Sequence, residues 1–238
     1  MNPPSDAPDD LVLLCPNCHK MATEGALSPD EQRWLKSNPV NVREGYASGR
    51  LKINQRAIAL TVGSNQFIGD GCILRVDDME LLRLDLNENG GIEITVELRD
   101  EMDRLLARIE RNEWRTEAPM SWDLECRHHW LTIRSGPGVK ILDIDAREYP
   151  ISLVADLWSR EWNIKLDKEM VFFKGVNETL GFSNICFVGT EFVVNTAKPS
   201  IGFGPDPKRG RAVFVSDPDV ETRVEKGLME WDKMIAQG

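Results

Sequence analysis

The stretch that most limits the fold of this chain is residues 92–99, which follow the turn-forming sequence NENGG. Apolar residues at positions 92, 94, 96 and 98 alternate there with polar residues at 93, 95, 97 and 99. A period of two is typical of a β-strand that buries one face and wets the other. The glycine-rich turn before it indicates a hairpin, and the pair therefore predicts an antiparallel sheet.

Similar short strands are predicted on the carboxyl side of this hairpin. The segments 105–109, 122–126, 131–133 and 139–144 are apolar or alternating, and turn sequences such as SGPG at 135–138 separate them. They predict an antiparallel β-meander of five or six strands, with the tryptophans at 114, 122 and 130 as core or sheet-face residues. The fold class is therefore predicted to be α+β and mainly β.

A capped helix is predicted before the β region. Ser28 is a typical N-cap, Pro29 occupies the first helical position, and Glu31 follows three residues after the cap. Trp34 and Leu35 are predicted to be core residues of this helix, which should end at the Asn-Pro pair at 38–39.

A second, amphipathic helix is predicted at the carboxyl end. It should start near Asp217-Pro218, and its apolar residues recur at helical spacing. These residues are Val220, Val224, Leu228, Trp231 and Ile235. The stripe indicates that the helix packs on the β region, or alternatively that it binds a protein partner or a second copy in a dimer.

The sequence suggests a division into five segments. They are a disordered N-terminus at 1–10, a cysteine motif with the capped helix at 11–39, a mainly-β domain at 40–198, a loop or linker at 199–216 and the C-terminal helix at 217–238. Two parts of the β domain resemble each other, because Asn65, Phe67 and Gly69 are matched by Asn184, Phe187 and Gly189. We expect these two parts to be neighbouring strands that close one domain.

Charge restricts the partners that the chain can bind. The 238 residues carry a net charge of −10, and residues 61–160 hold most of the excess acid, with 12 basic against 20 acidic side chains. Phosphate contacts require basic surfaces, so only the neutral N-terminal segment is predicted to contact DNA. No apolar run is long enough for a membrane span and no signal peptide is evident, so the expected location is cytoplasmic and away from membranes. Five cysteines, two of them in a CxxC pair and three scattered, fit a reducing compartment better than a disulfide framework.

Metal-binding residue types cluster in the stretch LVLLCPNCHK at 11–20, where Cys15 and Cys18 are two residues apart and His19 follows directly. An apolar strand that leads into CxxC is half of a zinc knuckle, and a tetrahedral site needs two more ligands. His19 would begin the next helix and point away from the knuckle. Cys126, His128 and His129 are a second set that could complete the site.

Residues 10–20 resemble the HNH (ββα-metal) endonuclease family, whose zinc-bearing members read N-L-[IV]-x-L-C-x-x-C-H before a short helix. The resemblance covers about residues 10–40. It implies that Cys15 and Cys18 bind structural zinc, that His19 ligates a catalytic magnesium or manganese ion, and that Asp10 takes the place of the family's central Asn. Hydrolysis of DNA phosphodiester bonds is the activity that it implies.

The family's first CxxC and its general-base His should precede this stretch by some tens of residues, and MNPPSDAPD contains neither. The 238-residue chain is therefore expected to be inactive alone. The alternative is a non-enzymatic, β-rich interaction or sensing module with a relic zinc knuckle. Acidic pairs at 77–78 and at 143 and 145 are expected to be solvated turn and strand residues.

Overall fold

The computed structural model describes residues 16–38, 43, 45–55, 58–117, 123–197, 200–205 and 211–237. The chain divides into two compact units, residues 1–47 and 48–238, and each is described here by itself. The predicted disordered segment 1–10, the predicted strand at 11–14 and Trp122 lie outside the described residues.

The described part of unit 1 consists mainly of two short helices, α1 (Pro16–Thr23) and α2 (Pro29–Ser37). The predicted cap of α2 is confirmed: the Glu31 backbone N–H donates to Ser28 Oγ, and the Ser28 backbone N–H donates to Glu31 Oε2 at 2.8 Å. Asn38 ends the helix, as expected. The prediction that Trp34 is a core residue was wrong, because its side chain is 52% exposed. The helix has the right apolar spacing, but no described residue of α2 is buried.

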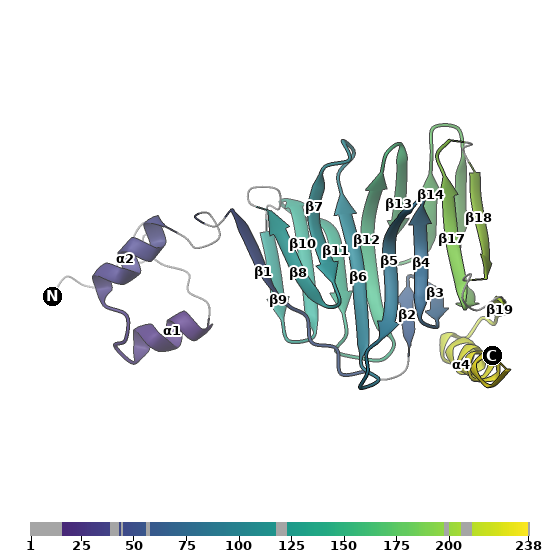
Figure 1. The fold of residues 1–238 in the computed structure, drawn as a ribbon, viewed down its shortest axis with the longest axis horizontal. Helices are drawn as coiled ribbons and strands as arrows, with labels where there is room; N and C mark the ends of the chain where they lie inside the picture. The colour runs from purple at the N-terminus through teal and green to yellow at the C-terminus, as the bar shows by residue number, and fades with distance from the viewer. Residues whose placement is uncertain are drawn as a thin grey trace. The chain divides into compact units, whose positions relative to one another are not determined.

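Unit 2 is a two-sheet β structure, which confirms the predicted mainly-β, α+β class (Figure 1). Eight strands of the described chain form sheet A. In their spatial order they are β1 (Tyr46–Arg50), β8 (Glu113–Glu117), β7 (Leu105–Glu110), β6 (Ile92–Arg99), β5 (Met79–Leu86), β4 (Gly71–Val76), β17 (Thr190–Asn195) and β18 (Ser200–Pro205).

Eleven described strands form sheet B, which branches at β12. The main path is β15 (Thr179–Phe182), β14 (Val171–Lys174), β13 (Trp162–Leu166), β12 (Ile151–Ser159), β2 (Ala59–Val62), β3 (Asn65–Ile68), β16 (Ile185–Val188) and β19 (Val213–Ser216). The branch is β11 (Val139–Asp145), β10 (Trp130–Gly136) and β9 (Asp123–Arg127).

The alternating stretch at 92–99 is a strand, β6, as its pattern predicts. Its residues 92, 94, 96 and 98 are 0–1% exposed, while the residues between them are partly exposed. The β5–β6 hairpin pairs Leu86 with Ile92 across the NENGG turn. The buried faces of the two sheets meet, since side chains of β4, β5 and β17 line one small void together with side chains of β2, β3, β13 and β14.

The two similar segments are neighbours, as expected. β3 pairs in parallel with β16 and β4 pairs in parallel with β17, so that Phe67 lies opposite Phe187. Their rings stack at a centroid distance of 5.1 Å. Phe192 packs edge-on against both rings and extends the aromatic core toward β14 and β18.

Residues 199–216 were predicted to be a loop or linker, and the structure corrects this. β18 pairs with β17 and β19 pairs with β16, each as an edge strand. The glycines and proline of GFGP are typical of turns and led to the wrong prediction for β18. Phe203 of this strand lies opposite Phe192 and joins the aromatic core. Cross-strand burial therefore outweighs the local turn composition.

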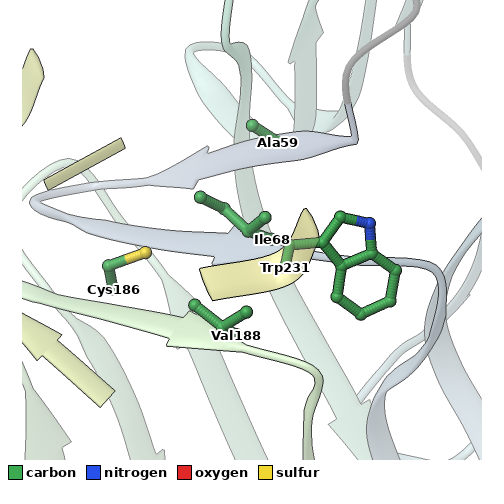
Figure 2. Packing of buried hydrophobic residues seen from close by; sticks show 5 residues of the cluster. All are labelled: Ala59, Ile68, Cys186, Val188 and Trp231. Atoms are coloured by element: carbon green, nitrogen blue, oxygen red, sulfur yellow. The ribbon is translucent and has the colours of Figure 1, made fainter. Parts of the chain in front are cut away.

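Helix α4 (Val220–Gln237) packs on sheet B, as one of the two predicted alternatives proposed. Figure 2 shows Trp231 beside Ala59, Ile68, Cys186 and Val188, which form one buried cluster. Gly227 makes the close approach possible, because a Cβ atom at this position would lie 2.5 Å from Ile68 Cδ1.

The first turn of α4 is fixed by an arginine. Arg223 is 0% exposed; its Nε donates to Gln66 Oε1 at 2.8 Å, its Nη2 donates to Ser64 O at 2.8 Å, and its Nη1 donates to Asp217 O. A buried guanidinium is tolerated only when its donors are satisfied, so these acceptors specify where the helix starts.

Candidate functional site

The cysteine motif leads into helix α1. Asp10 and Cys15 lie outside the described residues, while Cys18 and His19 lie in the first turn of α1. The helix begins at Pro16, a residue type favoured at the first helical position, so Pro16 and Asn17, which separate the two cysteines, are helical, and the helix starts before His19 and not at it. The zinc and catalytic-metal roles of Cys15, Cys18 and His19 stay predictions.

The two helices of unit 1 surround no core within the described residues. No described side chain of this unit is buried, and the apolar side chains of Met21 and Trp34 are 44% and 52% exposed. The guanidinium of Arg43 lies 5.8 Å from the centre of the Trp34 ring. Helices of eight and nine residues are marginal in water without tertiary packing.

The second predicted ligand set lies at the turn between β9 and β10. Cys126 is exposed and its thiol lies 4.0 Å from Arg50 O. His129 Nδ1 lies 2.6 Å from Lys52 O, so this nitrogen is a hydrogen-bond donor and not a metal ligand here. The ring centroids of His128 and His129 are 6.4 Å apart. Across the described residues, no group of three or more His, Cys, Asp or Glu could hold a metal ion.

The acidic residue Asp77 is occupied by structural hydrogen bonds. The Thr196 backbone N–H donates to Asp77 Oδ1 at 2.9 Å, the Thr196 hydroxyl donates to Oδ2 at 2.6 Å, and Arg160 forms an ion pair with the same carboxylate. These donors, the Thr196 backbone first, hold the pKa of Asp77 below its usual value. The carboxylate joins the turn after β4 to the turns after β12 and β17.

Asp143 is satisfied in a similar way on β11. It accepts from Trp130 Nε1 at 2.7 Å, from the Thr132 hydroxyl at 2.5 Å and from Lys140 Nζ at 2.6 Å. Burial acts to raise its pKa, but the three donors outweigh burial and lower it. Asp77 and Asp143 were expected to be solvated, but their side chains are only 20% and 21% exposed and accept several hydrogen bonds. They are therefore structural residues and poor candidates for a general base.

Besides Arg223, the described residues contain a second buried ionic group that the sequence did not predict. Glu191 on β17 is 4% exposed and accepts from Arg75 Nε on β4 at 2.6 Å. Arg75 also pairs with Glu80, and Arg83 joins Glu80 to Asp85. Burial, and next the charge of Glu191, raise the pKa of the Cys72 thiol far above its usual value. This thiol is therefore neutral and inert, and the group is a structural ion network.

Comparison with known proteins gives no match for this chain among protein-family models, curated proteins or solved structures. In the part of the chain that the structure describes, no helix has the length and apolar character that crossing a bilayer requires.

Proposed function

We propose that residues 10–23 are the C-terminal half of an HNH-type metal-dependent DNA endonuclease site, joined to a β-rich unit of separate function. The observation that carries the proposal is the order CxxC-His with a helix that begins inside the motif, at Pro16. The resemblance implies this order, and α1 contains both Cys18 and His19.

The donor set fits half of each metal site. Cys15 and Cys18 supply two of the four ligands that tetrahedral zinc requires, and His19 supplies one nitrogen ligand for a magnesium or manganese ion. That ion, when bound, would stabilise negative charge on the scissile phosphate. The chain's other two histidines, at 128 and 129, belong to the β9–β10 turn. The site would also need a neutral histidine that accepts the proton of the attacking water, and the CxxC-His stretch does not itself supply a second histidine.

The exposed apolar side chains of unit 1 support this reading. Met21 and Trp34 lie on helices that bury no described residue, so unit 1 gains little stability from its own packing. A segment that carries the first half of the motif would supply both the missing ligands and the missing apolar contacts. The 238-residue chain alone is accordingly expected to cut no DNA.

Metal binding gives the first test. Purified protein should contain zinc well below one equivalent, and added Zn²⁺ should bind weakly through Cys15 and Cys18. A Cys15→Ser/Cys18→Ser variant should lose this binding, and the matched variant Cys126→Ser should keep it, because Cys126 is exposed on β9 far along the chain. Zinc binding that depends on Cys126 and not on the CxxC pair would contradict the proposal.

Cleavage gives the second test. Supercoiled plasmid is incubated with Mg²⁺ or Mn²⁺ and the chain alone, with His19→Ala as the control. No cutting above the control is expected. Cutting that requires His19 would show that the site is complete in this chain and would refute the expected inactivity, while it would support the assignment of His19.

The second candidate function is a non-enzymatic interaction or sensing module with a relic zinc knuckle. It is favoured by the contrast between the units: unit 2 has a continuous buried core, and its singled-out acids are committed to structural hydrogen bonds. The two candidates differ when a segment with CxxC and paired histidines is fused before residue 10. The nuclease reading expects zinc at one equivalent and His19-dependent cleavage, and the relic reading expects neither.

A further inference from the structure

We propose that unit 2 binds the phosphate backbone of DNA through a basic corner where the edges of the two sheets meet. The basic corner consists of Arg50, Lys52, Arg127, His128, His129, Trp130 and Arg147. The patch itself is independent of the nuclease motif, and the choice of DNA as the polyanion rests on the proposed function.

Backbone hydrogen bonds bring these distant residues together. The chain leaves β1 at the edge of sheet A and runs along the β9–β10 turn at the edge of sheet B (Figure 1). The Lys52 backbone N–H donates to His128 O at 2.9 Å, and His129 Nδ1 lies 2.6 Å from Lys52 O. The Ala146 backbone N–H donates to His129 O at 2.8 Å, which adds the segment before Arg147.

The cations of the corner are exposed and largely uncompensated. Arg50, Lys52 and Arg127 are exposed, and none of the three makes an ion pair within the described residues. Elsewhere in unit 2 most arginines are neutralised, as in the Arg75–Glu80–Arg83 network and the Arg99–Glu97 pair. The carboxylates at the corner are Asp145, which pairs with Arg147, the exposed Glu148, and Asp143, which accepts from Trp130 Nε1 and pairs with Lys140. Four cationic side chains therefore face three carboxylates, one of which, Asp143, is neutralised by Lys140.

Trp130 orients two of the guanidinium groups. The Cζ atoms of Arg127 and Arg147 lie 5.7 and 5.8 Å from the centre of its ring. The ring is held by the hydrogen bond from its Nε1 to Asp143 Oδ1 at 2.7 Å. Arginine stacked on an aromatic ring loses less entropy when it binds, and its planar donors match a phosphate. The corner therefore offers guanidinium groups oriented by one ring, which fits sequence-independent contact with the backbone.

The acidic remainder of the chain does not prevent this contact. Screening limits exposed charges to about 10 Å at 0.1 M salt, so a phosphate at the corner is affected chiefly by the corner itself. With about three phosphates neutralised, the slope of log K against log salt should be near −2.7, and the affinity should fall about 40-fold between 50 and 200 mM salt.

The test uses the full chain, a fluorescent 20-base-pair duplex of arbitrary sequence, EDTA to exclude metals, and anisotropy at several salt concentrations. Lys52→Glu/Arg127→Glu should weaken binding at 50 mM salt at least tenfold and reduce the salt slope by about 1.8. The matched control is Lys168→Glu/Lys174→Glu, on the β14 side of sheet B. It makes the same charge change at two exposed lysines that form no ion pair within the described residues, and its affinity should stay within threefold of wild type. Far-UV circular dichroism checks the fold of each variant.

The neutral pair Lys52→Gln/Arg127→Gln removes the two cationic contacts without adding repulsion between carboxylates and phosphates. It should show most of the change in salt slope that Lys52→Glu/Arg127→Glu shows. Equal weakening by both charge-reversal pairs would overturn the proposal, since it would show a nonspecific effect of net charge. Retention on heparin without DNA binding would also overturn it. Because no metal is present, this assay reports on the basic corner alone. Binding that Lys52→Glu/Arg127→Glu leaves unchanged would overturn the basic corner and leave the nuclease proposal untouched. Absence of His19-dependent cleavage after the upstream half of the motif is fused would remove the nuclease proposal and leave the basic corner.

Discussion

Replacing Trp231 by alanine tests how strongly α4 is held on sheet B. The indole is 6% exposed and packs in the cluster shown in Figure 2. It also covers the turn between β3 and β4, where Gly69 has a φ of +121° and a Cβ atom would lie 2.6 Å from Trp231 Cζ3. A buried tryptophan covers about 150–250 Å², which corresponds to about 4–6 kcal/mol of transfer free energy.

An outer helix can move inward to fill part of the space, so we expect Trp231→Ala to lower the free energy of unfolding by about 3–4 kcal/mol. With a urea m-value of about 2.5 kcal/mol/M, the unfolding midpoint falls by about 1.2–1.6 M. The assay is urea unfolding followed by far-UV circular dichroism. Met229→Ala is the control in the same helix; Met229 is 58% exposed, and its truncation should cost about 0.5 kcal/mol or less.

Equal midpoints for the two variants would refute the reasoning, because they would mean that the indole contributes no packing energy. A biphasic curve for Trp231→Ala would have a different meaning. It would show that α4 unfolds separately, and the loss would then be read from the second transition alone.

Three further predictions follow from the same structure. Gly227→Ala should destabilise unit 2 although alanine favours a helix by about 1 kcal/mol, because its Cβ would lie 2.5 Å from Ile68 Cδ1 and 2.6 Å from Cys186 Sγ; a higher unfolding midpoint would contradict this. The lowered pKa of Asp77 means that its charge stabilises the fold above the unfolded pKa of about 3.9, and that this stability is lost as pH falls through the folded pKa. The difference in unfolding free energy between wild type and Asp77→Asn should therefore be largest near pH 6 and should shrink below pH 4. A thiol reagent at pH 8 should label exposed Cys126 quickly and leave Cys186, whose pKa is raised by burial to about 12, unreacted until urea unfolds the chain; Cys126→Ser should remove one fast equivalent and Cys186→Ser none.

Local patterns in the sequence predicted the elements that depend on local chemistry. The alternation at 92–99, the Ser28 cap and the spacing of Val224 and Trp231 each reflect a periodic burial or a short-range hydrogen bond, and each is present in the structure. Elements that depend on distant partners were missed. β18 exists because Phe203 meets Phe192 across the ladder, and no local pattern reports that contact.

The candidate sites show the same division. Because residues 61–160 hold most of the excess acid, the sequence predicted that only the N-terminal segment contacts DNA. The basic corner takes residues from positions 50–52, 127–130 and 147, and only the folded chain brings them together. The prediction for Trp34 was wrong for a different reason. The apolar spacing of its helix predicts a buried face, but spacing alone does not show whether the described chain supplies a surface that covers it.

The parallel pairing of β3 with β16 has a consequence for biosynthesis. Phe67 and Phe187 are opposite each other but stand 120 positions apart in the chain. At about 5–20 residues per second, a ribosome needs roughly 6–24 s to add the residues that separate them. During that interval the edge of β3 and the apolar face that α4 later covers are open to other nascent chains, so the yield of native protein should depend on chaperone supply more than its final stability would suggest.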